Sequence, residues 1–302
     1  MNSAMRSGLG RDKVFDIVNY ALVTLFVLSV LYPLYFMVIA SFSDPFAVNR
    51  GEVWLWPKDL NLSAYEAVFE FQRLWTGYGN TLLYATGGSI AAVLTTTGFA
   101  FALSRKEFVI RRWVAFILVF TMLFQGGLIP RFMLVRNLGL YNTRLYIMIF
   151  HNMTTVWWII IARTFFNGMP EELFDSAKMD GAKAATVFWR IALPLAKPMM
   201  AVIFLFAFVM HWNMYFAALI YLSDSAKDPL QVVLRQLLLV SQMNSQATTE
   251  LMQDQETMEE ALRTAELMKY AVIVVAAVPL LIIYPFLQRY FVKGAMVGSL
   301  KG

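Results

Sequence analysis

The sequence has 302 residues, of which 59% are hydrophobic and only 15% are charged. A soluble domain usually carries about a quarter charged residues, so this composition predicts an integral membrane protein. The absence of cysteine excludes a disulfide framework, a Cys-ligated zinc site and a thiol nucleophile. The net charge of +5 would suggest a nucleic-acid partner in a soluble protein, whereas in a membrane protein basic cytoplasmic loops explain it.

Six stretches are long and apolar enough to cross about 30 Å of hydrocarbon as helices of about 20 residues. They lie near residues 15–40, 80–103, 113–133, 143–162, 199–222 and 269–291. Proline or glycine interrupts several of them, which is tolerated where neighbouring helices satisfy the freed backbone groups. The predicted fold is therefore an all-α bundle of six transmembrane helices, forming a single domain over residues 1–302.

The loops between these stretches predict how the chain is oriented. With a cytoplasmic N-terminus, the inside segments contain 15 of the 25 basic residues but only 7 of the 20 acidic ones. The inside then carries a net charge of +8 and the outside −3, in line with the positive-inside rule. Both ends of the chain are therefore expected in the cytoplasm. The first stretch is too long for a signal-peptide core and lacks a small-residue cleavage site, so an uncleaved anchor is expected.

This orientation places two long segments outside the membrane. Residues 41–79 are rich in aromatic side chains such as Trp54 and Trp56, which favours an interfacial belt over a ligand site. Residues 223–268 carry eight carboxylates against three basic side chains, which predicts an acidic external arm.

The usual signatures of catalysis are missing. The sequence has no Walker-type phosphate loop, no His-Glu-x-x-His and no Gly-x-Ser-x-Gly. Its two histidines, His151 and His211, are each more typical of a helix contact than of a catalyst. We therefore predict no catalytic residue and no metal ligand in this chain.

The connection between the fourth and fifth spans, residues 163–198, is polar and helical. Pro170 suits the first position of a helix, and the two glutamates after it lie where the helix dipole favours negative charge. Leu173, Phe174 and Ala177 are three and four residues apart, which predicts one apolar stripe.

A glycine divides this connection into two predicted helices. Gly181 follows Asp180 where a left-handed stop ends the first helix. A second helix is expected from Ala182 to Ile191, after which Leu193-Pro194 turns the chain back into the membrane. An amphipathic helix lying on lipid headgroups is an alternative that the composition leaves open.

The motif at residues 172–182 reads Glu-Leu-Phe-Asp-Ser-Ala-Lys-Met-Asp-Gly-Ala, and Ile-Ala-Leu-Pro at 191–194 is separated from Gly181 by nine residues. It resembles the "EAA" loop of permease subunits of bacterial ABC importers, with a consensus of Glu-Ala-Ala-x-x-x-Gly, nine residues, then Ile-x-Leu-Pro. Gly181, Ile191, Leu193 and Pro194 match in place. The triplet reads Asp175-Ser176-Ala177 instead, which alters the detail of the expected contact but preserves the helix–glycine–helix shape.

Further motifs extend the resemblance along nearly the whole chain. They look like the carbohydrate-importer branch, and most like permeases for oligosaccharides and polysaccharide fragments, including the aldouronate and alginate types. The motifs lie at residues 126–130, 138–143, 211–213 and 290–302.

The resemblance implies an importer permease fold in the bacterial inner membrane, with a cytoplasmic coupling helix in loop 163–198. The implied partners are a second homologous permease subunit, a cytoplasmic ATPase dimer and an external solute-binding protein, which the segments 41–79 and 223–268 are candidates to contact. This chain would bind no cofactor, because ATP and magnesium would sit on the ATPase. The residues expected to couple to the ATPase are Glu172, Leu173, Phe174, Asp175, Ser176, Ala177, Asp180, Gly181, Ile191, Leu193 and Pro194.

The substrate pathway is expected along the fourth and fifth spans, because polar side chains inside a span usually face a partner or a water-filled cavity. Aromatic faces stack on the C–H faces of a sugar, and amides bond its hydroxyls. Packing between helices explains the same residues about equally well. The candidates are His151, Asn152, Thr155, Trp158, Trp212, Asn213 and Tyr215.

Several functions remain open on the sequence alone. For a polyuronate substrate, Arg131, Arg136 and Arg144 at the outer ends of spans are the candidates for attracting it, whereas the acidic arm would repel it. An importer of neutral sugars is one alternative. A channel or secondary transporter is another, although the mid-span regions hold almost no acidic residue for ion coupling. A membrane enzyme lacks a catalytic constellation here.

Overall fold

The structure is a computed structural model that describes residues 3–124, 126–151, 155–239 and 268–285. The regular elements among these residues are all helical. Within the single domain expected from the sequence, contacts group the chain into two compact units. One unit is Met1–Glu70 with Leu237–Val275, and the other is Phe71–Gln236 with Ala276–Gly302.

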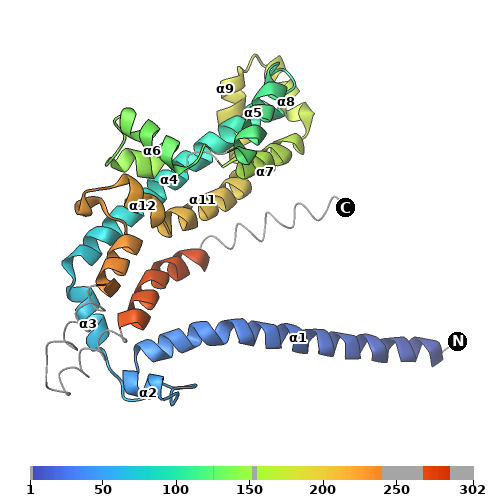
Figure 1. The fold of residues 1–302 in the computed structure, drawn as a ribbon. Coiled ribbons are helices and arrows are strands. Elements are labelled where there is room, and N and C mark those ends of the chain that lie inside the picture. Colours follow the sequence, from blue (N-terminus) through green and yellow to red (C-terminus); the bar gives the residue numbers. More distant parts are fainter. Residues whose placement is uncertain (1–2, 125, 152–154, 240–267, 286–302) are drawn as a thin grey trace. The chain divides into compact units, whose positions relative to one another are not determined.

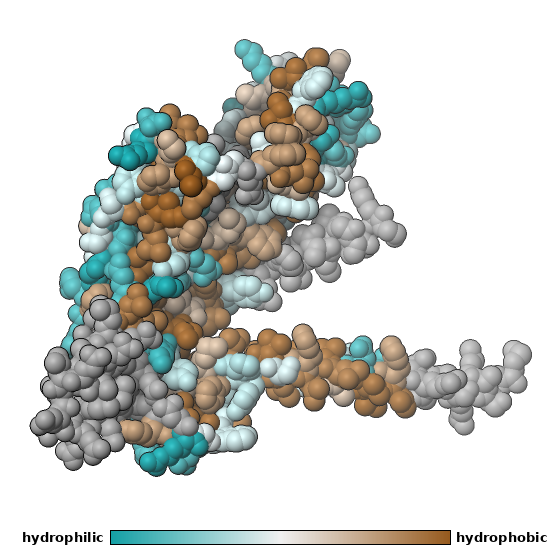
Figure 2. Space-filling view, in the orientation of Figure 1, coloured by the Kyte–Doolittle hydropathy of each residue, from teal (hydrophilic) through white to brown (hydrophobic). Residues whose placement is uncertain are grey.

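The first unit begins with the long helix α1 (Ser3–Ser41), which contains the first predicted span. Its side chains are exposed at every position from 13 to 35, and Figure 2 shows mostly hydrophobic residues along the coloured part of this helix. A helix that is apolar on all sides is stable in hydrocarbon or buried in an assembly, and not in water. The sides of α1 are therefore surfaces for lipid or for contact with other protein surfaces.

Two short helices follow α1 in the same unit, α2 (Pro45–Asn49) and α3 (Ser63–Glu70). The Tyr65 ring stacks on Phe42 with centroids 5.0 Å apart, and its hydroxyl lies 2.7 Å from the Ser41 hydroxyl. Trp54 and Trp56 stay 69% and 78% exposed, as an interfacial aromatic belt requires.

The second unit is built around α4 (Gln72–Ser104), against which α7 (Val156–Asn167) and α11 (Lys197–Trp212) pack (Figure 1). With 33 residues, α4 is about 50 Å long and extends beyond the hydrocarbon. Small residues on α4 allow its neighbours to approach closely. At Gly88 the imidazole of His211 occupies the space that a Cβ atom would need.

Three predicted spans each consist of two helical pieces. The pieces are α5 (Arg111–Leu123) and α6 (Leu128–Asn137), the π-helical η1 (Tyr146–Phe150) and α7, and α11 and α12 (Phe216–Tyr221). By length and composition, three described helices are able to cross a membrane, or up to five if each of two sharply bent helix pairs counts as one span. The three are Lys13–Ser41, Gln72–Ser104 and Met268–Pro285.

Candidate coupling site

The helix–glycine–helix shape expected in loop 163–198 is present. Helix α8 (Glu171–Met179) begins directly after Pro170 and is followed by Gly181 with a left-handed backbone, φ 78°. The N–H groups of Gly181 and Ala182 close the end of α8 by donating to carbonyls of its last turn, both at 2.9 Å. This is the glycine-terminated helix end that the motif predicts.

The second half of the loop differs from the expected single helix. It consists of α9 (Ala184–Val187), the π-helical η2 (Phe188–Ala192) and α10 (Leu193–Leu195). The bend of 79° comes at Ala196, after the Leu-Pro pair rather than at it. Pro194 lies directly after the π-helical turn η2, within a helical stretch that runs from Ala184 to Leu195, and prolines and π-helical turns are both common places for a helix to bend.

The apolar stripe of α8 divides between two directions. Phe174 and Ala177 are 2% and 8% exposed and belong to the core around α4, α7 and α11. Leu173 is 42% exposed and Met179 is 88% exposed. Phe174 and Ala177 therefore hold α8 on the chain itself, while Leu173 and Met179 remain free to meet another protein.

Arg105, at the end of α4, is the residue that ties α8 down. Its guanidinium carbon lies 4.0 Å from the centre of the Phe174 ring and 5.2 Å from that of Phe101. The same group donates to the Phe166 carbonyl at the end of α7, at 3.1 Å. Partial burial lowers the pKa of Arg105 from its ordinary value, although an arginine stays charged at any physiological pH. One cation thus joins the ends of α4 and α7 to α8.

A groove of about 620 Å³ lies beside these contacts, between the end of α4 and the segment from α8 to η2. Phenylalanines and alanines form most of its lining, and Arg105, Glu107 and Lys178 stand at its edge. Phe101 is the central ring, with centroids 5.2 Å from Phe188 and 5.7 Å from Phe166.

Two exposed ion pairs connect the loop after α4 to α8. Lys106 lies 2.7 Å from Glu171, and Lys178 lies 2.5 Å from Glu107. The hydrogen bond from Lys178 holds the pKa of Glu107 below its usual value, and the same bond raises the pKa of Lys178. A lowered carboxyl pKa stabilises the contact above the ordinary pKa of Glu, and a raised amine pKa stabilises it below that of Lys. The pair is therefore intact between about pH 5 and about pH 10.

Replacing Glu107 by glutamine should lower uptake by less than about twofold, because exposed ion pairs are screened by solvent and contribute little. Transport that relies on this pair should also be constant between about pH 6 and about pH 8.5. Initial uptake rates in vesicles, with Asp16→Asn on an exposed carboxylate of α1 as the control, test both statements. A large loss in Glu107→Gln alone would show that this contact is needed for coupling.

The departure from the motif at Asp175-Ser176 is accommodated within α8. The Ser176 hydroxyl donates to the Glu172 carbonyl at 2.6 Å, one turn earlier in the helix. Asp175 lies 3.2 Å from Lys178. Both side chains, with Glu172 and Asp180, stay exposed on the side of α8 away from the core.

The structure does not place the fourth-span pathway candidates on one helical face. Thr155 has an extended backbone (φ −106°, ψ 116°), so no continuous helical face joins His151, Thr155 and Trp158. Trp158 is buried in the core around α4. Asn152 lies outside the described residues.

The fifth-span candidates also divide. Trp212 is fully buried, stacks on Phe208 with centroids 5.9 Å apart and donates to the Ala276 carbonyl at 3.1 Å. Asn213 is exposed and Tyr215 half-buried, at the break between α11 and α12. Of the fifth-span candidates, these two remain accessible.

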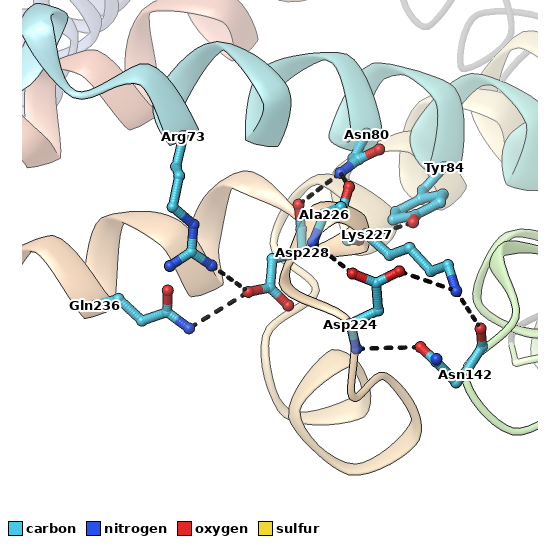
Figure 3. Close-up of polar contacts among 9 residues, drawn as sticks. All are labelled: Arg73, Asn80, Tyr84, Asn142, Asp224, Ala226, Lys227, Asp228 and Gln236. Atoms are coloured by element: carbon cyan, nitrogen blue, oxygen red, sulfur yellow. Dashed lines mark hydrogen bonds and ion pairs between the residues drawn. The ribbon is translucent and has the colours of Figure 1, made fainter.

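A set of polar contacts that the sequence did not predict holds residues 224–230 against α4 (Figure 3). The Asn80 amide donates to the carbonyls of Ala226 and Asp228 at 2.9 and 3.0 Å. The Tyr84 hydroxyl donates to the Lys227 carbonyl at 2.8 Å, and Arg73 pairs with Asp228 at 3.0 Å. Positions 73, 80 and 84 share one face of α4, so a single polar stripe satisfies the backbone of this segment.

Asn142 supports the same segment from the other side (Figure 3). Its side-chain oxygen accepts the N–H groups of Ser223 and Asp224, both at 3.2 Å, and its carbonyl accepts Lys227 Nζ at 2.9 Å. Its left-handed backbone, φ 58°, is one that asparagine tolerates better than most residues. Asn142 belongs to the motif at residues 138–143, so the sequence did mark this position. The sequence did not show that Asn142 contacts residues 223–227.

Comparison with known proteins gives matches along nearly the whole chain. The family model described as binding-protein-dependent transport system inner membrane component matches residues 2–297. YtcP of Bacillus subtilis (strain 168), a polygalacturonan/rhamnogalacturonan transport system permease protein, is 35% identical over 97% of this chain and 100% of its own length. LplC of the same organism is 35% identical over 96% of each chain. A crystal structure of a bacterial ABC transporter involved in the import of the acidic polysaccharide alginate has a chain with 35% identity and a TM-score of 0.80, covering 93% of this chain and 98% of that one.

Proposed function

Because the chain belongs to the family of inner membrane components of binding-protein-dependent transport systems, we propose that it is the permease subunit of an ATP-driven importer for an oligosaccharide or polysaccharide fragment. The full-length similarity to a polygalacturonan/rhamnogalacturonan permease carries this proposal. The alginate-importing structural relative supports an acidic substrate. The chain would form half of the translocation pathway, and the other half would come from a second homologous permease.

The energy for transport would come from a separate ATPase dimer that binds ATP and magnesium. Loop 163–198 would receive it, with α8 as the coupling helix on the cytoplasmic side. One face of α8 packs on the helical core of the chain and the opposite face is exposed. This arrangement supports the role, because an ATPase bound to the exposed face would move the core through the packed face. Both termini would then be cytoplasmic, and six spans would place segments 41–79 and 223–268 outside.

The substrate pathway would pass the break between α11 and α12, where Asn213 and Tyr215 are accessible. Arg131 and Arg144 are also exposed and would attract a uronate. Trp158 and Trp212 would instead support the pathway from within the core. A neutral sugar remains the second candidate substrate, and uptake competition between neutral and acidic oligosaccharides separates the two.

The test of the proposed function is co-purification of the chain with its partners from native membrane. We expect a second permease, an ATPase and a solute-binding protein, with an acidic oligosaccharide bound to the last. A chain that purifies without an ATPase and still transports would be a secondary transporter or a channel, and the proposal would be wrong.

Replacing Asn80 by alanine should lower binding-protein-dependent uptake by about tenfold or more. The change leaves two carbonyls of the external segment without their donor, at a cost of about 1–3 kcal/mol each where they are buried. The segment that carries the external arm would then lose its fixed position on α4. Uptake at increasing binding-protein concentration measures this. Asn137→Ala, on an exposed asparagine at the end of α6, is the control and should behave as wild type.

A further inference from the structure

A second, polar pocket of about 320 Å³ lies where the loop after α4 meets the start of α5 and the end of α7. Its lining includes five basic residues and one carboxylate, Glu171. The basic residues are Arg105, Lys106, Arg111, Arg112 and Arg163. The pocket therefore has a net charge of about four positive units at neutral pH.

Part of this charge is satisfied within the chain. Lys106 pairs with Glu171 at 2.7 Å. Arg105 donates to the Phe166 carbonyl, and Arg111 donates to the Arg105 carbonyl at 3.3 Å. The two arginine contacts use the carbonyl ends of α7 and α4, and the carbonyl end of a helix attracts cations.

Two guanidinium groups remain. The Nε atom of Arg163 is buried and has no hydrogen-bond partner in the part of the chain that the structure describes. Arg112 is exposed at the second position of α5, with no ion pair among the described residues. A buried donor without a partner is costly, and Arg163 as a whole is only partly buried and lines the pocket, so its guanidinium is open to an anion there.

The surroundings of the pocket place it at the edge of the membrane. Helix α5 starts at Arg111 and then exposes Trp113, Phe116 and Ile117, which are 71%, 62% and 56% exposed. A basic turn, then tryptophan, then an apolar surface is the order in which a helix enters a bilayer from the headgroup layer. In that arrangement the pocket would lie at the depth of lipid phosphates.

We propose that this pocket binds the phosphate of an anionic phospholipid headgroup, held by Arg163 and Arg112. The positive-inside rule explains basic residues in a loop, but it does not gather them around a cavity with a buried guanidinium nitrogen. The negative lipids of the cytoplasmic leaflet supply the matching charge on the side proposed for this loop. The lipid would also bear on coupling, since Glu171 begins α8 and Arg105 packs on Phe174.

The experiment follows thermal unfolding of the full-length chain, purified in a neutral detergent with its partner subunits. Short-chain phosphatidylglycerol, phosphatidylcholine of equal chain length and inorganic phosphate are titrated separately. We expect phosphatidylglycerol alone to raise the unfolding temperature saturably. Its half-saturating concentration should increase about fivefold or more in Arg163→Gln and in Arg112→Gln. Arg190→Gln, on an exposed arginine of η2, should match wild type.

The results separate the possible occupants. Unchanged half-saturation in both variants would overturn the assignment of the site, and an equal response to phosphatidylcholine would overturn the requirement for an anionic lipid. Saturation by inorganic phosphate, with no preference for phosphatidylglycerol, would show a site for free anions and overturn the lipid. Arg112 is exposed, so its variant tests the site even if Arg163→Gln fails to fold.

Discussion

Replacing Gly181 by proline should reduce ATP-dependent uptake by about a hundredfold or more, while the chain still inserts in the membrane. Proline fixes φ near −65° and has no N–H, whereas Gly181 has φ 78° and donates to the Lys178 carbonyl at 2.9 Å. A proline that cannot adopt the native backbone costs about 3 kcal/mol or more, so the end of α8 would unravel. Uptake of labelled oligosaccharide and the amount of co-purified ATPase measure the effect.

Gly51 offers a matched control for this substitution. It also has a left-handed backbone, φ 68°, its N–H donates to the Val48 carbonyl at 3.0 Å, and a Cβ atom at either glycine would meet open space. Gly51→Pro therefore makes the same backbone change in a segment predicted to be external. We expect the Gly51→Pro variant to co-purify with as much ATPase as the wild-type chain does. Normal uptake by the Gly181→Pro variant would refute the role of α8 in coupling.

The glycine stop of α8 was predictable because it depends on local chemistry. A left-handed residue after a helix favours glycine wherever the helix lies, and the cap bonds come from the same turn. The sequence also predicted the all-helical architecture, because long apolar stretches with few charges are typical of membrane-spanning helices.

The features that the sequence did not predict depend on distant partners. Leu173, Phe174 and Ala177 form one stripe in the sequence, but only the fold decides which of them faces α4. The extended backbone at Thr155 was not predicted, because the hydrophobic pattern of an apolar stretch does not distinguish a continuous helix from an interrupted one. In the sequence, nothing distinguished Arg105 from the other basic residues of the predicted cytoplasmic loops. Its contact with Phe174 was not predictable because the two residues lie far apart in the chain.

Replacing Phe174 by alanine should separate anchoring from docking. Its ring is almost fully buried among Phe101, Arg105 and the rest of the core. Truncating a buried phenylalanine costs about 3–5 kcal/mol, so α8 should detach and both stability and uptake should fall. Phe116→Ala, on an exposed phenylalanine of α5, should change stability by about 0.5 kcal/mol or less. Thermal unfolding of the purified chain gives the comparison.

Replacing Leu173 or Met179 by aspartate should weaken ATPase binding while leaving the stability of the chain almost unchanged, in contrast to Phe174→Ala. Both side chains are exposed in the isolated chain, so a carboxylate there remains hydrated and stability should change little. If these side chains become buried against the ATPase, each contributes about 1.5–3 kcal/mol and a charge in its place weakens docking by at least that much. ATPase binding should therefore fall by about tenfold or more in chains that unfold at the wild-type temperature. Equal ATPase binding in Leu173→Asp, Met179→Asp and wild type would move the docking surface away from this face of α8. Phe174 would then hold in place a helix whose partner is the membrane surface, because only lipid headgroups would remain to cover its outer side.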